Sequence, residues 1–187
     1  MSKNLNLSFS EAVLNCFPQD GGMYVPIFDE SFANWILYMN GQTSFQSIAG
    51  TLTSAMIKEE FSPIISEAIA TEAFPFSPGF EQIDESLYKL DLYTGPTGSH
   101  KDFGISYLAA CLEYTLLMQD KTATVIAICD KAIGSSIVHA MRGKTRLKAI
   151  LLHQKGKTKG MEESDCIWNG GNIYPVEVDG SLDECSE

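Results

Sequence analysis

The sequence contains few basic residues and no long apolar run, and each shortage excludes a class of function. Its 13 lysines and arginines are outnumbered by 24 aspartates and glutamates, which gives a formal net charge of −11. This charge repels phosphate backbones, so neither nucleic acid nor an anionic membrane is expected as a partner. No stretch has the roughly 18 apolar residues of a membrane span, and no signal-peptide core follows Met1. We therefore expect a cytoplasmic protein.

Patterns for disulfides and metal sites are missing as well. The five cysteines are dispersed without a Cys-x-x-Cys pair, and the three histidines are far apart in the sequence. An odd, scattered set of cysteines in a chain of this kind favours reduced thiols over disulfides. Because thiol, imidazole and carboxylate ligands are not clustered, we expect no metal site.

The apolar residues, which make up 44% of the 187, suffice for a globular core, and their pattern divides the chain in two. Residues 1–87 are predicted to form a mainly helical N-terminal region. Ser8 and Glu11 have the spacing of a capping box at the start of one helix. Ser44 begins a second helix that runs to residue 58, and Ser62, followed by proline, begins a third that ends near Phe74.

Residues 88–187 are predicted to form an α/β portion. Strands without polar alternation are separated by helical patterns, which is typical of a parallel sheet covered on both faces. Ligands bind such sheets beyond the carboxyl ends of the strands, so the loops after Tyr93 and Cys129 are candidate sites. The expected strands are residues 88–93, 122–129, 147–153 and 173–178, and the expected helices are residues 101–118, 134–142 and 161–168.

Lys101 is the strongest candidate for chemistry. It follows a small turn-forming loop and precedes an apolar helical run, in a stretch at residues 94–103 that reads Thr-Gly-Pro-Thr-Gly-Ser-His-Lys-Asp-Phe. A lysine in this position can reach into a cleft and form a Schiff base with an aldehyde cofactor, because the loop holds the amine near the backbone and the helix fixes its direction. The alternative is a surface lysine at a helix start, and the spacing alone favours that alternative.

The stretch at residues 94–103 also resembles the lysine loop of the threonine synthases, which are fold-type II pyridoxal-phosphate enzymes with the tryptophan-synthase-β-like fold. Two other segments resemble the same family in the same order. They are residues 8–26, which end in Asp-Gly-Gly-Met-Tyr-Val-Pro, and residues 171–185, which begin with Gly-Asn and end in Asp-Glu-Cys. The resemblance spans almost the whole chain and corresponds to the N-terminal part of the family's chain. It implies an α/β fold in which a helical N-terminal cap precedes part of a parallel sheet.

The resemblance also implies a function and a set of site residues. Lys101 would carry pyridoxal 5'-phosphate and act as general acid and base, while O-phosphohomoserine is converted to threonine and phosphate. His100 has a counterpart in a similar Thr-Gly-Ala-His-Lys stretch of the tryptophan synthase β subunit, where the histidine approaches the cofactor phosphate. A loop histidine packed on its neighbours is the alternative for His100. The other implied contacts are cofactor binding by Ser99 and Thr97 and substrate binding by Gly134 and Ser135.

One loop departs from the family pattern. Threonine synthases have Ser-Gly-Asp-Thr-Gly after the central strand, whereas residues 130–135 here read Asp-Lys-Ala-Ile-Gly-Ser. Only Gly134 and Ser135 match, and Ala132 replaces the family's acidic residue. Losing a hydrogen bond to a charged group costs on the order of 1.5–3 kcal/mol, so several such losses could abolish the reaction. A shift of register that gives Asp130 the acidic role is the lesser alternative.

Two hypotheses are compatible with the sequence. In the first, the chain is the N-terminal portion of a threonine-synthase-like lyase, with Lys101 as the Schiff-base residue. The family's phosphate-binding loop would then lie further along the chain than Glu187. In the second, the chain is a non-catalytic fragment or degenerate paralogue that keeps the fold and associates with another chain. Apolar surface left uncovered by the missing part would favour self-association in either case.

Overall fold

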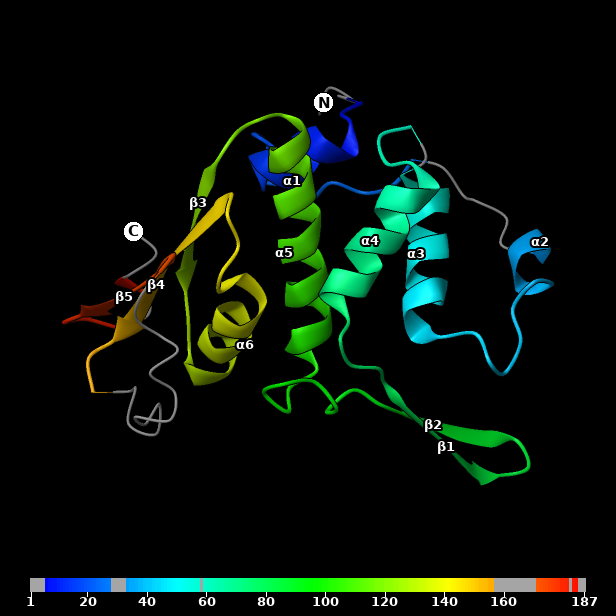
Figure 1. The fold of residues 1–187 in the computed structure, drawn as a ribbon. Coiled ribbons are helices and arrows are strands. Elements are labelled where there is room, and N and C mark those ends of the chain that lie inside the picture. Colours follow the sequence, from blue (N-terminus) through cyan, green and yellow to red (C-terminus); the bar gives the residue numbers. More distant parts are fainter. Residues whose placement is uncertain (1–5, 28–32, 58, 157–170, 182, 185–187) are drawn as a thin grey trace. The chain divides into compact units, whose positions relative to one another are not determined.

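A computed structural model describes residues 6–27, 33–57, 59–156, 171–181 and 183–184 of the chain (Figure 1). The chain divides into two compact units, Met1–Glu72 and Ala73–Glu187. The domain boundary expected between residues 87 and 88 stays a prediction. The helix expected at residues 161–168 lies outside the described residues, as do Cys166 and Cys185.

The first unit is helical, and hydroxyl side chains cap its helices. Ser8 Oγ accepts a hydrogen bond from Glu11 N, and Glu11 Oε2 accepts one from Ser8 N, so the predicted capping box is confirmed. Ser44 caps the third helix by accepting from Ser47 N at 3.1 Å. Phe61 and Ile69 are fully buried in the core of this unit. The helices are α1 (Phe9–Asn15), α2 (Ala33–Ile36), α3 (Phe45–Met56) and α4 (Pro63–Ala73).

The second unit contains a parallel three-stranded sheet in the order β3-β4-β5. This arrangement confirms the predicted α/β class. The first helix after the loop at residues 94–100 begins at Lys101 and ends at Met118, as the sequence predicts. The elements of the unit, in order, are β1 (Gly79–Asp84), β2 (Leu87–Asp91), α5 (Lys101–Met118), β3 (Ala123–Ile128), α6 (Lys131–Met141), β4 (Leu147–Gln154) and β5 (Ile173–Val178).

The strand predicted at residues 88–93 does not belong to the parallel sheet, and this part of the prediction is wrong. Its observed counterpart β2 pairs antiparallel with β1, a strand that is not among the predicted ones. Leu87, Lys89 and Asp91 lie on the opposite face of the ribbon from Tyr88 and Leu90, and alternation of this kind is typical of a hairpin rather than of a buried parallel strand. The loop after Tyr93 is therefore not at the carboxyl end of a strand of the parallel sheet.

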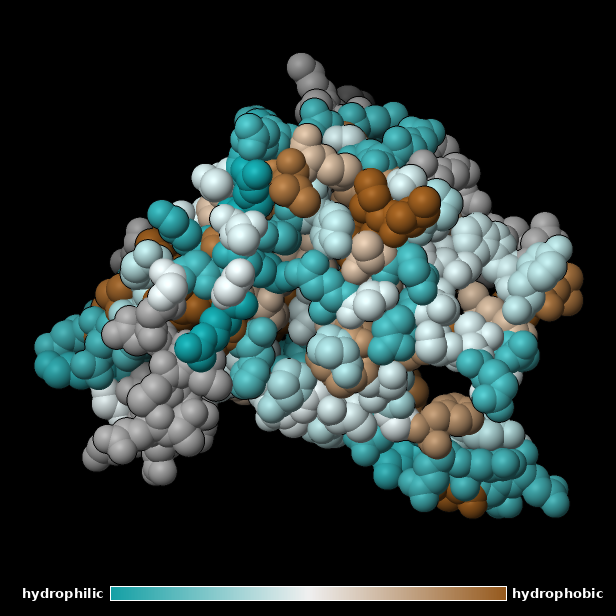
Figure 2. Space-filling model, in the orientation of Figure 1, coloured by the Kyte–Doolittle hydropathy of each residue, from teal (hydrophilic) through white to brown (hydrophobic). Residues whose placement is uncertain are grey.

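Within the described residues, helices cover one face of the parallel sheet. On that face Leu147 and Leu151 of β4 are buried, and α6 lies against the strand with Val138 in the core. Figure 1 shows α5 on the same side of the sheet, beside α6. The opposite face is apolar as well, and Figure 2 shows brown, hydrophobic surface in the region of these strands. The exposed apolar residues on this opposite face of the sheet are Ile126, Ile128, Tyr174 and Val176, whose exposure ranges from 37% to 65%.

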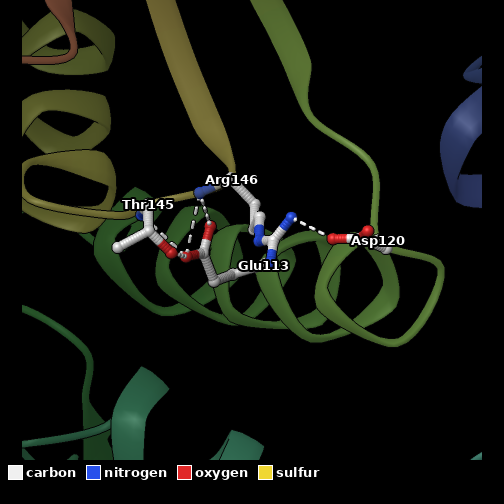
Figure 3. Close-up of polar contacts among 4 residues, drawn as sticks. All are labelled: Glu113, Asp120, Thr145 and Arg146. Atoms are coloured by element: carbon white, nitrogen blue, oxygen red, sulfur yellow. Dashed lines mark hydrogen bonds and ion pairs between the residues drawn. The ribbon is translucent and has the colours of Figure 1, made fainter.

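Polar contacts fix the C-terminal half of α5 against the start of β4 (Figure 3). Glu113 accepts hydrogen bonds from the backbone N–H groups of Thr145 and Arg146, at distances of 2.7–3.1 Å, and from the Thr145 hydroxyl. Arg146 also pairs with Asp120 at 2.9 Å, just beyond the end of the helix. Because the C-terminal half of α5 is held at the amino end of β4, its N-terminus lies toward the carboxyl ends of the strands.

Candidate functional site

Lys101 is the first residue of α5, and its amine lies beside the end of β3. Its Nζ is 3.8 Å from Asp130 Oδ2, and about one third of its side chain is exposed. Asp130 follows β3 after one residue and is the N-cap of α6, where its Oδ1 accepts from Ile133 N at 2.8 Å. The lysine amine is therefore at the carboxyl end of a parallel strand, which is where ligands bind in sheets of this type.

The loop before Lys101 is held close to the first turn of α5. Gly98 has a φ of +65°, in the left-handed region that favours glycine, and its N–H donates to Gly95 O at 3.1 Å. Ser99 accepts from the N–H groups of the next turn, with its hydroxyl bonded to Lys101 N and its carbonyl to Asp102 N. A Cβ added to Gly95 would lie 2.5 Å from Asp102 Oδ2, so the loop backbone approaches the helix too closely for a side chain there.

Asp102 is a buried carboxylate that joins this loop to both helices. It accepts hydrogen bonds from Thr97 N at 2.9 Å, from the Thr97 hydroxyl at 2.7 Å and from the Ser136 hydroxyl at 2.6 Å. Burial tends to raise the pKa of Asp102, but the hydrogen bonds from Ser136, Thr97 and the Ser99 backbone outweigh it and hold the pKa below its usual value. Asp102 is therefore ionised at neutral pH, and it fixes the direction in which α5 starts.

Aromatic packing supports the same turn of α5. Phe103 lies 5.0 Å from Phe76, edge to face, and 6.1 Å from Phe74, measured between ring centroids. Phe74 also stacks on Tyr107, one turn further along the helix. The two residues after Lys101 are thus both held in place, Asp102 by hydrogen bonds to its carboxylate and Phe103 by an aromatic cluster. The Lys101 side chain reaches toward β3.

The other site residues expected from the sequence lie on the same loop or on α6. His100 is exposed at the start of α5, with its ring edge-on to Tyr93. The Thr97 hydroxyl is bonded to Asp102 and lies 3.2 Å from the Ser136 hydroxyl, so the loop and α6 meet at this point. Gly134 is buried and its N–H donates to Asp130 O, whereas Ser135 is half-buried. The ligand contacts expected of these residues stay predictions.

Two residues with structural roles in this site were not identified from the sequence. Asp102 is within the Lys-Asp-Phe stretch, and this stretch could have indicated its importance. From the sequence alone, a role is predicted only for its neighbour Lys101. Ser136 follows Ser135 directly, and the sequence does not show which of the two hydroxyls turns toward the loop. In the structure it is Ser136, 1% exposed, that reaches Asp102.

Neither buried thiol near these elements has the properties of a nucleophile. Burial raises the pKa of Cys111 to about 12. Burial, together with the negative charge of Asp130, raises the pKa of Cys129 to about 11. Both are protonated at neutral pH, and a thiol attacks as its thiolate. Among the described residues, no group of three or more histidine, cysteine or carboxylate side chains could hold a metal ion, and no helix of that part is long and apolar enough to cross a membrane.

Sequence comparison finds threonine synthases along almost the entire chain. The enzyme of Escherichia coli is 28% identical over 182 residues, which are 97% of this chain and 42% of that protein. The enzyme of Haemophilus influenzae is 29% identical over 96% of this chain and 41% of its own length. No protein-family model matches the chain. The chain thus spans about two fifths of the length of the curated relatives that it matches.

Structure comparison finds the same enzymes. The crystal structure of threonine synthase from Escherichia coli matches with a TM-score of 0.74 at 28% identity, over 96% of this chain and 42% of that one. The structure of pyridoxal-phosphate-bound threonine synthase from Brucella melitensis matches with a TM-score of 0.82 over 96% of this chain and 40% of that one, and at 24% identity it supports the fold. The chain is therefore similar to the threonine synthases along almost its whole length and has the fold of about two fifths of such an enzyme.

Proposed function

We propose that this chain forms the lysine-bearing part of a pyridoxal-phosphate-dependent lyase of the threonine synthase type, with O-phosphohomoserine as substrate and threonine and phosphate as products. The observation that carries the proposal is the position of Lys101. Its amine lies at the carboxyl end of β3, in a chain that is similar to these enzymes over 97% of its length. Because the chain spans only about two fifths of those relatives, the complete activity would also need the groups supplied by their remaining part.

The residues around Lys101 fit one end of the cofactor. Pyridoxal phosphate supplies an aldehyde for a lysine amine and a ring that takes up electrons from the substrate. The Lys101 side chain is partly exposed and takes no part in the buried hydrogen-bond network of Asp102, so an aldehyde can approach it from solvent. After substrate displaces it, the same amine can hold and return the substrate's α-proton. Asp102 and Phe103 keep the helix start rigid while this happens.

The remaining expected contacts belong to the same proposal. His100, which is exposed next to Lys101, can donate to the cofactor phosphate, and Ser99 has a hydroxyl on the same loop. The Thr97 hydroxyl already donates to Asp102. Thr97 is therefore proposed to help bind the cofactor mainly by holding the loop in its conformation. Gly134 and Ser135, near the start of α6, are proposed to contact the substrate.

A non-catalytic role is the second candidate, and the loop at residues 130–135 favours it. Asp130 in this loop is engaged with the α6 backbone and with Lys101, and Ala132 has no polar side chain. The chain would then be a fragment or a degenerate paralogue that keeps the fold and associates with another chain. The similarity to active enzymes favours the first candidate, and the altered loop is the reason for testing both.

The outer face of the β3–β5 sheet supports a proposal of self-association. Strand register aligns its apolar side chains in two rows, which are Ile126, Ile150 and Tyr174 in one and Ile128, Leu152 and Val176 in the other. Contiguous apolar surface of this kind usually marks an interface. Light scattering coupled to size-exclusion chromatography would show a dimer or larger species if this is correct, and a clean monomer at all concentrations would refute it. A cytoplasmic location stays a prediction.

The activity itself is tested by phosphate release from O-phosphohomoserine in the presence of added pyridoxal phosphate. Release by the wild-type chain, and none by Lys101→Ala, would support the lyase. If neither protein releases phosphate but the cofactor attaches to Lys101, the chain carries the cofactor lysine and lacks groups that the reaction needs. If the cofactor does not attach either, the second candidate function is the better account.

A further inference from the structure

Asp130 uses its two carboxylate oxygens for different purposes. Oδ1 accepts the hydrogen bond from Ile133 N that caps α6, at 2.8 Å. Oδ2, which takes no part in that bond, lies 3.8 Å from Lys101 Nζ. Both side chains are only partly buried, with exposures of 33% for Lys101 and 54% for Asp130. The ion pair therefore joins the first residue of α5 to the cap of α6 at the carboxyl end of β3.

We propose that Asp130 is a positioning residue that holds the Lys101 amine in an ion pair and withholds it from covalent attachment until the pair opens. This inference rests on the function proposed for Lys101. An ammonium held against a carboxylate must leave it and lose a proton before its nitrogen can attack a carbonyl carbon, because the attack needs the nitrogen lone pair. For attachment, the ammonium must release one proton to solvent and the nitrogen must bond to the carbonyl carbon. The carbonyl oxygen must then leave as water, with the two protons that remain on the nitrogen.

The resemblance of residues 130–135 to the family's loop implies that the charge at residue 130 departs from the family pattern. Aligned on Gly134, Asp130 takes the place of the serine that begins the Ser-Gly-Asp-Thr-Gly loop given by that resemblance. A serine can cap a helix as aspartate does, but it carries no charge. This departure would add a counter-ion for Lys101 and keep the helix cap.

The proposal is tested without any cofactor, by labelling amines with limiting acetic anhydride at fixed pH and mapping the labelled peptides by mass spectrometry. The informative variant is Asp130→Asn, because asparagine is also a good helix cap but has no charge. Lys121, an exposed lysine after α5 whose amine donates to the neutral Gln119 side chain, serves as the internal reference. We expect Lys101 to be labelled about two- to fivefold faster in the variant, the size of effect expected for a partly exposed ion pair.

Salt provides a second readout that a purely structural role would not change. Added salt screens exposed ion pairs, so it should accelerate labelling of Lys101 relative to Lys121 in the wild type and have no such effect in Asp130→Asn. Asp130→Ala, which removes both the cap and the charge, should accelerate labelling as well. If Asp130→Asn labels Lys101 at the wild-type rate, Asp130 is only a cap and the proposal is wrong. Since pyridoxal phosphate is absent from this experiment, its result is independent of whether the cofactor binds.

Discussion

The Ser136 hydroxyl donates to the buried carboxylate of Asp102 at 2.6 Å, and this bond joins the first turn of α5 to α6. Replacing Ser136 by alanine leaves one oxygen of a buried, charged group with one hydrogen bond fewer. Hydrogen bonds to charged groups contribute about 1.5–3 kcal/mol, and we expect Ser136→Ala to lower the free energy of unfolding by a similar amount. Urea denaturation measures the loss. Ser135→Ala is the matched control, and an equal effect of both changes would contradict the assigned role.

Gly95 should not tolerate a side chain. A Cβ at this residue would lie 2.5–2.9 Å from three atoms of Asp102, including its Cβ, so either the loop or the helix start must move. We expect Gly95→Ala to destabilise the protein by about 1–3 kcal/mol, the cost of overpacking a filled site. Gly104→Ala, within α5, provides the control because nothing lies within 4 Å of its added Cβ. It should be neutral or stabilising by up to about 1 kcal/mol. Thermal or urea denaturation compares the two, and equal effects would show that the close approach is absent.

Asp102 gives the protein a specific sensitivity to acid. Its pKa is lowered in the folded protein by hydrogen bonds from Ser136 and Thr97 that outweigh burial, and on unfolding the pKa returns to its ordinary value of about 3.9. The stabilisation is therefore complete only above about pH 5, one unit above the unfolded pKa, and is lost as the pH falls through the folded-state pKa, because the unfolded chain binds the proton more readily. The difference in unfolding free energy between wild type and Asp102→Asn should shrink below pH 4. A difference that stays constant with pH would contradict this account.

The cysteines should differ widely in reactivity. Cys16 is exposed, whereas Cys111 and Cys129 are buried and have pKa values raised to about 12 and about 11. With a thiol reagent at pH 7.5 and peptide mapping, Cys16 should react within minutes and the two buried thiols only after denaturant is added. Fast native labelling of Cys129 would show that the end of β3 is open, contrary to the packing described above.

The local elements could be predicted from the sequence where the signal is also local. The Ser8–Glu11 capping box, the helix from Lys101 to Met118 and the strand at residues 173–178 all follow from the residues of the element itself. The start of α6 was expected at Gly134 but lies at Lys131, because the Asp130 side chain caps the helix three residues earlier. A cap of this kind can be recognised in a sequence only if the end of the preceding strand is predicted at the right residue.

Contacts between residues that are far apart in the chain could not be predicted from the sequence. The pairing of β2 with β1 depends on a partner strand that has few apolar residues, so residues 88–93 were assigned to the wrong sheet. The bond from Ser136 to Asp102 and the ion pair from Asp130 to Lys101 each join residues that come together only when α5 packs against α6. The sequence indicated which lysine to consider, and the structure shows which carboxylate lies beside it.

Covalent attachment of pyridoxal phosphate decides whether Lys101 is the cofactor lysine of this chain. The purified chain would be incubated with pyridoxal phosphate, reduced with borohydride and mapped by mass spectrometry, beside Lys101→Ala. If Lys101 is the cofactor lysine, the pyridoxyl label will be found mainly on the peptide that contains it, and the variant will lose that label without gaining another. A label distributed over exposed lysines such as Lys89 and Lys148, at the same level in both proteins, would contradict the claim.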